Sequence, residues 1–455
     1  MNKLSYFYVL LTRSASANLI EFEGAPDNVN IDTCNQNTLL FSNQLSGLNP
    51  GDTFLLPNST YCFNGGIFAK NKNNITIKID GTLWFQPDKK LWAKKDELDY
   101  VNALHFENFT NVVFTSSAIG TFEGNGQAWW GYAQYLVHNK HRPLLFTIYR
   151  SENLLFENLF FHNSPRFNFY ASDVKNVEIR HCKIEARRSD VDWHDFYNIA
   201  AFNTDGFDIS GENIWLHHCE IWNDDDTIAV KHADSSFIKT NCSQNMLFEN
   251  IKASGVGLSI GSIGSNNNHK CVRNITFRHV EMHHPVKGIY IKSRPNDKGT
   301  GVITDVTYEN ITIISPTQWG IWIGPQQAYA PQFQGACPLG WPQSSNECPV
   351  PSRVEMKNFY LKDIRIIDPT GSPGVILGNV TNPIQNLTFD NVVVENPGGY
   401  PWGDRYYNCK NTYGQALGKT WPIPDCLEDY THSETTSDST KLLLAFHIVF
   451  LKIFG

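Results

Sequence analysis

The sequence has few charged residues for its length and no hydrophobic run long enough to cross a membrane. Charged residues make up 18% of the 455 residues, and the formal net charge is −8. Because there is no basic stripe, we expect no nucleic-acid partner. The apolar run 442–455 is shorter than the roughly 20 residues that a membrane span needs. Aromatic residues reach 13% and glycine and asparagine are abundant, which is typical of a secreted protein that handles a polar polymer such as a polysaccharide.

Both ends of the chain carry patterns typical of export. Lys3, an apolar run and the small residues 15–17 predict a signal peptide over residues 1–17. Residues 431–455 combine a polar spacer with an apolar tail, which is typical either of a lipid-anchor signal or of a disordered tail. We therefore expect a secreted protein, with any membrane attachment made through that tail. Some of the N-x-S/T sequons are expected to carry glycans; they begin at Asn58, Asn74, Asn108, Asn241, Asn274, Asn310, Asn379 and Asn386.

One short pattern recurs along the chain. Its second and fourth positions are apolar, its seventh and ninth nearly always so, and its sixth is Asn, Asp or His. The period of two indicates short strands, and the slip at the sixth position indicates a polar corner. A copy cannot bury its apolar face alone, so stacked copies must share a core. The sequence predicts an all-β fold with a single parallel β-helix over residues 18–430, with copies starting at Asn153, Asn176, Asn213, Asn245, Asn274, Asp305, Asn358 and Asn386.

The cysteines fit an oxidising compartment. Cys182 and Cys219 fall at an apolar position of the repeat, and we expect them to be free and buried. The other eight can form local bridges, chosen here for nearness in sequence. The expected pairs are Cys34–Cys62, Cys242–Cys271, Cys337–Cys348 and Cys409–Cys426.

Carboxylates gather in the stretch 203–231. Asp205 lies in a turn, and an acidic triplet ending in Asp225 and Asp226 follows a short apolar strand. Neighbouring coils of a stack lie roughly 4.8 Å apart, so these acids can meet on one face. Gathered carboxylates raise one another's pKa and suit general acid/base chemistry. A solvated loop or a calcium site is the alternative for each motif taken alone.

Basic residues follow two coils later on the same face. Tyr290, Lys292 and Arg294 alternate along one predicted strand, so all three point to one side, where the two cations can bind a substrate carboxylate. Acids beside cations favour a glycosidase acting on an acidic sugar. The alternatives are a dextranase-like glucanase, a polysaccharide lyase, and a β-helix that binds polysaccharide without cleaving it.

At these residues the chain resembles family 28 of the glycoside hydrolases, the polygalacturonases and their relatives, from roughly residue 30 to 400. Asn203-Thr204-Asp205-Gly206 matches the N-T-D-G motif, and Asp225-Asp226 matches the Asp-Asp pair. The G-H-G motif reads Gly255-Val256-Gly257, and the R-I-K motif reads Tyr290-Ile291-Lys292. The family His and Arg are therefore missing. Trp319 stands where relatives often carry Tyr before Gly.

The resemblance implies a right-handed parallel β-helix, a pectin-lyase-like solenoid, and hydrolysis of pectin-type polysaccharide with inversion. Asp225 would be the general acid, while Asp205 and Asp226 would hold and activate the water. We expect a monomer that needs no metal or cofactor. His194 and His232 are the candidates to replace the missing imidazole. The residues expected to contact substrate are Asn203, Lys292, Tyr290, Arg294, Trp319, Lys231 and His194.

Overall fold

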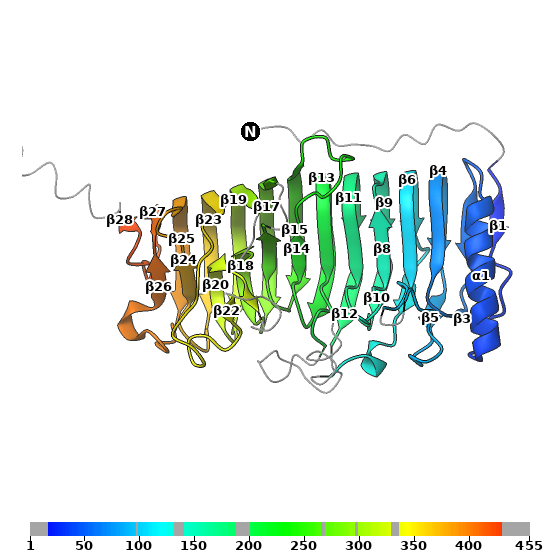
Figure 1. Ribbon diagram of the computed structural model, residues 1–455, viewed down its shortest axis with the longest axis horizontal. Coiled ribbons are helices and arrows are strands. Elements are labelled where there is room, and N and C mark those ends of the chain that lie inside the picture. The colour runs from blue at the N-terminus through cyan, green and yellow to red at the C-terminus, as the bar shows by residue number, and fades with distance from the viewer. Residues whose placement is uncertain are drawn as a thin grey trace, which may run out of the picture.

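The chain forms a long stack of short parallel strands. The computed structural model describes residues 17–96, 99–131, 141–187, 201–264, 269–295, 299–328 and 336–429. Figure 1 shows the strands side by side, from α1 at one end to β28 at the other. The all-β prediction and the stacking of parallel strands are confirmed. The expected C-terminal tail, and all but the last residue of the expected signal peptide, lie outside the described residues.

The helices and strands follow one another in this order along the chain. The first part of the chain contains β1 (Leu19–Glu21), α1 (Ile31–Gly47), β2 (Thr53–Leu56), β3 (Thr60–Phe63), β4 (Ile67–Ile79), β5 (Thr82–Phe85), β6 (Leu104–Thr115), β7 (Gly120–Glu123), β8 (Phe146–Tyr149), β9 (Glu152–Glu157), β10 (Leu159–His162), β11 (Phe169–Arg180) and β12 (Lys183–Ala186). The middle contains β13 (Phe207–Asn223), β14 (Ile228–Val230), β15 (Cys242–Ala253), β16 (Leu258–Ile263), β17 (His269–His283), β18 (Lys287–Ser293), β19 (Thr300–Ile314) and β20 (Trp319–Pro325). The last part contains β21 (Gln327–Ala328), β22 (Cys337–Pro338), β23 (Val354–Ile367), β24 (Gly374–Leu377), β25 (Ile384–Glu395), β26 (Tyr407–Lys410), β27 (Thr412–Leu417) and β28 (Glu428–Asp429), with short 3-10 helices at Gly126–Ala128 and Gly403–Arg405.

Strand β13 shows how one coil is built. Its residues 207–209 pair in parallel with β11 and β14, its residues 214–217 pair with β11 and β15, and its residues 220–223 pair with β12. Asn213 and His218 stand at the corners between these straight runs, with φ of 60° and 53°. Each coil therefore has straight sides joined at corners in the left-handed region, which Asn and His tolerate better than most residues.

The polar sixth position of the repeat is a corner, as predicted. His181, His218 and His279 all have φ between 51° and 54°. The rings of His181 and His218 lie 5.3 Å apart on successive coils, and the Asn310 side chain lies 2.7 Å from His279 Nδ1. These histidines form part of the corner rather than of a chemical site.

The first position of the repeat forms a second polar row, which the strand pattern did not predict. Each asparagine amide there donates a hydrogen bond to the side-chain oxygen of the asparagine one coil earlier. The links joining Asn153, Asn176, Asn213, Asn245 and Asn274 measure 2.7 to 3.2 Å. We call this row the asparagine ladder. It provides hydrogen-bond partners for the asparagine side chains at the corners, and it holds the coils in register.

The interior is a continuous apolar core. Phe248, Phe277 and Tyr308 occupy equivalent places in three coils, and their rings stack at 4.7 and 4.9 Å. Burial of such a side chain stabilises the fold by about 1.5–3 kcal/mol. Cys182 and Cys219 lie in this core and are free, as predicted.

A helix and four disulfides secure the stack. Helix α1, which the repeat pattern did not predict, buries Phe41 and Leu45 against the first coils. Its N-cap Asn30 accepts a hydrogen bond from the Thr33 N–H at 2.9 Å. The disulfides are those predicted, Cys34–Cys62, Cys242–Cys271, Cys337–Cys348 and Cys409–Cys426. Among the described residues, no helix is long and apolar enough to cross a membrane.

Candidate active site

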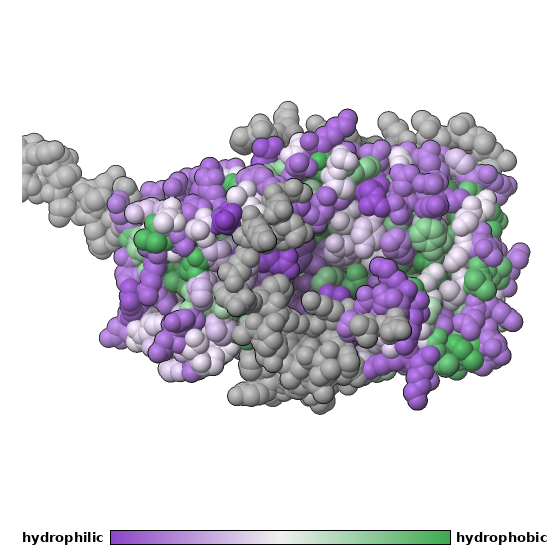
Figure 2. Space-filling view, viewed as in Figure 1, coloured by the Kyte–Doolittle hydropathy of each residue, from purple (hydrophilic) through white to green (hydrophobic). Residues whose placement is uncertain are grey.

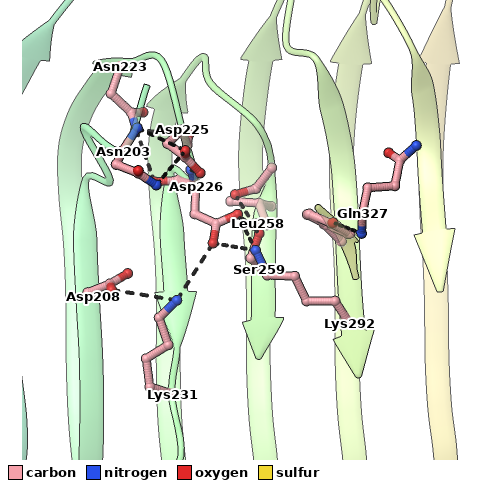
Figure 3. Close-up of polar contacts among 12 residues, drawn as sticks. Asn203, Asp208, Asn223, Asp225, Asp226, Lys231, Leu258, Ser259, Lys292 and Gln327 are labelled. Atoms are coloured by element: carbon pink, nitrogen blue, oxygen red, sulfur yellow. Dashed lines mark hydrogen bonds and ion pairs between the residues drawn. The ribbon is translucent and has the colours of Figure 1, made fainter. Parts of the chain in front are cut away.

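The structure brings Asp205, Asp225 and Asp226 together. Asp205 lies two residues before β13 and Asp226 two residues before β14, and these strands pair in parallel, so the acids lie on adjacent coils. One oxygen from each of the three carboxyl groups lies within 4.8 Å of the others. Gly206 allows this approach, because a Cβ there would lie 2.3 Å from Thr227 O. Figure 3 shows Asp225 and Asp226 with their polar neighbours, and Figure 2 shows a mainly hydrophilic face that is hollowed near its middle.

The turn that carries the acid pair is organised by Asn223. This side chain is fully buried. Its amide donates hydrogen bonds to the carbonyl oxygens of Thr204, Asp225 and Asp226 at 2.9 to 3.0 Å. One side chain thus ties the turn before β13 to the turn before β14, which sets the relative positions of the carboxylates.

Asp226 is surrounded by cations. Lys292 Nζ lies 2.8 and 2.5 Å from its two oxygens, and the Ser259 hydroxyl donates to it at 2.7 Å. Lys231 Nζ lies 3.8 Å away. Burial alone would raise the pKa of Asp226, but Lys292, Lys231 and the hydrogen bonds outweigh it and hold the pKa below its ordinary value. Asp226 is therefore a carboxylate that stays ionised.

Asp225 has the opposite electrostatic setting. Burial and the neighbouring Asp226 charge raise its pKa above the ordinary value, although Lys292 partly opposes the shift. Asn203 holds its Oδ2 through the backbone N–H at 3.0 Å and the side-chain amide at 3.3 Å. Asn203, expected from its motif to contact substrate, thus fixes the orientation of Asp225. Adjacent acids with pKa values pushed apart are typical of acid/base pairs.

A fourth acid, Asp208, joins the cluster and was missed by the motif reading. It is buried on the outward side of β13, between the inward-facing Phe207 and Ile209. Burial raises its pKa to about 6, while Lys231, whose Nζ lies 3.5 Å from Asp208 Oδ2, opposes the shift. In the sequence, the alternation of Asp208 with apolar residues was the signal that could have placed it on the outward side of the strand. Its partner Lys231 belongs to the next coil and is not marked by that local pattern.

Asp205 is the most strongly perturbed of the motif acids. Burial, and then the charges of Asp208, Asp225 and Asp226, raise its pKa well above the ordinary value. Its Oδ1 has no hydrogen-bond partner among the described residues. The cluster therefore combines three acids with raised pKa values and one, Asp226, whose pKa is lowered.

Two of the residues expected to bind substrate lie instead in an aromatic cluster. Tyr290 and Trp319 are buried with Trp322 and Trp341, and the Tyr290 hydroxyl accepts the Gln327 N–H at 3.3 Å. The Tyr290 ring also lies under Lys292, whose Nζ is 4.3 Å from its centroid. The Tyr290 ring therefore packs against the Lys292 ammonium group, and Tyr290 itself stands where the family motif has Arg.

Lys287 lies inside the same cluster, which the sequence did not indicate. Its Nζ donates to Gln318 Oε1 at 2.7 Å and lies 4.9 Å from the Tyr290 ring. Burial, and then the charge of Lys292, lower its pKa to about 7. Strands β16 and β18 pair in parallel, with Leu258 opposite Ile289. Lys287, two residues before Ile289, therefore lies one coil after Val256, which is two residues before Leu258.

The remaining candidates lie at the edge of the site or outside it. Arg294 follows the end of β18, is half-buried, and donates its backbone N–H to Ile263 O at 2.9 Å. His232 pairs with Asp234, with Nε2 3.2 Å from Oδ1. His194 lies outside the described residues.

The Gly255-Val256-Gly257 segment supports the acid turn even without a histidine. The Val256 N–H donates to Asp225 O at 2.8 Å. Gly255 has φ of 127°, and a Cβ there would lie 2.6 to 2.8 Å from Thr227, Asn223 and Asp225 atoms. Glycine is required at that place by close approach, so this part of the motif is retained for structural reasons.

A solenoid of parallel strands that carries two adjacent acids, with their pKa values shifted in opposite directions, is typical of a class of enzymes, the glycoside hydrolases. The model described as "Glycosyl hydrolases family 28" matches residues 52–417, and the chain belongs to this family.

Relatives and solved structures agree with the assignment. The chain is 28% identical over 249 residues to a polygalacturonase of Chamaecyparis obtusa and 26% identical over 272 residues to one of Juniperus ashei, and it spans about half of their length, 43% and 48%. An exopolygalacturonase of Cochliobolus carbonum is 25% identical over 389 residues, 78% of this chain and 79% of that protein.

Among solved structures, an endo-xylogalacturonan hydrolase from Aspergillus tubingensis matches with a TM-score of 0.59 at 21% identity, covering 90% of this chain and 98% of that one. A family 28 exopolygalacturonase from Yersinia enterocolitica matches with a TM-score of 0.64 at 14% identity, covering 90% and 80%. At such identities these two structures support the fold alone.

Proposed function

We propose that the protein hydrolyses glycosidic bonds of a pectin-type acidic polysaccharide. The observation that carries this proposal is the acid cluster, in which Asp226 is held ionised by Lys292 while burial and charge repulsion raise the pKa of Asp225. Hydrolysis needs one carboxyl group that donates a proton and one carboxylate that activates water. The two adjacent acids meet both needs.

The roles follow from these charge states. Asp225 protonates the glycosidic oxygen, because its raised pKa keeps a proton available and Asn203 fixes its orientation. Asp226 and Asp205 hold the attacking water, with Asp226 as the acceptor of its proton. Lys231 and Lys292 neutralise the negative charge of the cluster, and Arg294 meets a substrate carboxylate at the edge of the site.

Inversion at the anomeric carbon is part of the proposal, and family membership supports it. Spacing does not, since one oxygen of each acid lies within 4.8 Å of the others, whereas inverting carboxyl groups are typically about 6.5–9.5 Å apart. A substrate and its water must then enter beside the cluster. Proton NMR of the first product, before mutarotation, distinguishes inversion from retention.

The substrate class rests on the relatives. Polygalacturonases and a xylogalacturonan hydrolase are similar to this chain. Because Lys292 is engaged by Asp226 and Tyr290 stands where the family has Arg, we propose a pectin-related polymer with fewer carboxylate contacts than plain polygalacturonate requires. We also propose that the coil is right-handed, which parallel crossovers favour, and that the protein is a secreted monomer whose disulfides form in an oxidising compartment.

Release of reducing ends from a panel of polysaccharides tests the function. We expect release from polygalacturonate, xylogalacturonan or rhamnogalacturonan, reduced about a thousandfold or more in Asp225→Asn, in line with loss of a general acid. The control Asp404→Asn changes an exposed carboxylate of a short 3-10 helix and keeps full activity. Activity only on neutral glucans contradicts the substrate class, and an unsaturated product absorbing in the ultraviolet contradicts hydrolysis.

A further inference from the structure

A row of partly exposed aromatic rings leads along the outer face of the stack to the acid cluster. It consists of Phe68, His105, Tyr149 and Tyr170, and we call it the aromatic ladder. Successive ring centroids are 5.5, 5.0 and 5.6 Å apart. These residues are separated by up to about a hundred positions in sequence, and only the coiling of the chain brings them together.

Strand register places Phe68, His105 and Tyr170 on the same sheet face as Asp208. Tyr149 follows Thr147 by two residues on β8, so it points to the same side. Phe68 pairs with His105, His105 with Thr147, Thr147 with Tyr170, and Tyr170 with Asp208. Coils are roughly 4.8 Å apart, so the row runs about 19 Å from Phe68 to Asp208. The apolar neighbours of these residues on each strand, such as Phe146, face the core.

The rings are available to a ligand and carry no charge. Phe68 is 41% exposed, and the other three are half-buried. Burial lowers the pKa of His105 and raises the pKa of Tyr149 and Tyr170, so all of these rings are neutral near neutral pH. The nearby charges of Glu107 and Arg150 are paired with each other.

The aromatic cluster on the other side of the acids is different. Trp322 is 0% exposed and its ring packs against Trp319, Trp341 and Tyr290. Those rings contact one another and serve as a core for the loop that carries the Cys337–Cys348 disulfide. The aromatic ladder, by contrast, presents ring surface to solvent.

We propose that the aromatic ladder binds further sugar rings of the same polysaccharide chain by their apolar faces, on the side of the acids toward β4. This rests on the proposed function, because the row is continuous with the acid cluster. An aromatic ring binds a sugar because the ring and the apolar face of the sugar bury area against each other. This contact needs no carboxylate on the substrate. The groove on this side therefore accepts neutral, esterified or substituted units as well as galacturonate.

The test measures binding of short and long oligogalacturonides to the Asp225→Asn protein by calorimetry. A disaccharide held at the acids does not extend 19 Å, whereas a long oligomer reaches Phe68, a distance of about four coils. We expect Phe68→Ala and Tyr149→Ala each to weaken binding of the long oligomer about fivefold to tenfold and to leave the short one unchanged. Tyr149→Phe, which keeps the ring, and Tyr413→Ala, which removes a 66% exposed ring on β27, should bind like the parent.

Salt separates ring stacking from ion pairing with Lys70, which lies beside Phe68 on β4. Ions screen charge pairs but not apolar contacts, so the loss in Phe68→Ala should be the same at low and high salt. Equal losses for short and long oligomers, no loss, a loss that disappears at high salt, or no binding of any oligomer would overturn the proposal. Failure of the hydrolase proposal would appear separately, as absent reducing-end release by the unaltered protein.

Discussion

The charge of Asp226 depends on Lys292. The lysine Nζ contacts both carboxylate oxygens from two coils away, and the pKa of Asp226 lies below its ordinary value. Removal of an opposite charge at this range raises a carboxyl pKa by about 1–3 units. In Lys292→Met we therefore expect the acidic limb of the kcat/KM profile to move upward by about 1–3 pH units, with a lower maximum. Lys292→Arg should keep the limb near its original place, and an unmoved limb in the methionine variant would show that Asp226 is not the base.

Asp208 makes stability fall with pH. Its pKa in the folded protein is about 6, above the ordinary 3.8, so the folded chain holds this proton more tightly than the unfolded chain. The resulting stabilisation is fully present below about pH 4 and is lost as pH rises through about 6, by on the order of 1–3 kcal/mol. Asp208→Asn should remove that part of the slope. Guanidinium unfolding at several pH values measures it; identical slopes in variant and parent would contradict the assignment, and Asp404→Asn is the control.

At the scale of elements, the asparagine ladder controls how coils join. Asn176 has φ of 52°, donates to Asn153 at 2.9 Å and accepts from Asn213 at 3.0 Å. Asn176→Ala loses the hydrogen bonds and strains a left-handed corner, at a cost of about 2–4 kcal/mol, whereas Asn176→Gly avoids the strain and costs about 1–2 kcal/mol. Urea unfolding compares the two variants. Equal losses would mean that backbone conformation does not govern the choice of asparagine.

The same scale explains what could be predicted from sequence. Strands, corners and the meeting of Asp205 with Asp225 follow from a repeat whose period and polar slip are local signals, and the disulfides follow from nearness in sequence. Asp208 was missed because its partner Lys231 comes from another coil, and Lys292 was assigned to substrate because alternation gives a side chain its direction but not its partner. Helix α1 was missed because its residues follow no strand period and are mostly polar, and no local pattern marks the aromatic ladder.

At the scale of the whole molecule, a solenoid must close its ends. Each coil contacts only its neighbours, so an open end exposes apolar core and lets coils separate in turn. Helix α1 covers the N-terminal end: Phe41 contacts Phe22, Phe54 and Phe63 with ring centroids 4.9 to 5.3 Å apart. The acid cluster lies several coils further along the stack, and Figure 1 shows that distance from α1 to β13.

Loss of the helix packing should therefore loosen the stack from this end. Phe41→Ala should cost about 3–5 kcal/mol locally, and hydrogen exchange should quicken first in β2 to β5, with β13 and β14 protected until higher temperature because stability in a stack is passed only between neighbours. Hydrolysis at low temperature should be nearly unchanged. Leu39→Ala, on the same helix but 66% exposed, should leave exchange as it was. Uniform acceleration in all coils would instead mean that the stack unfolds as a single unit.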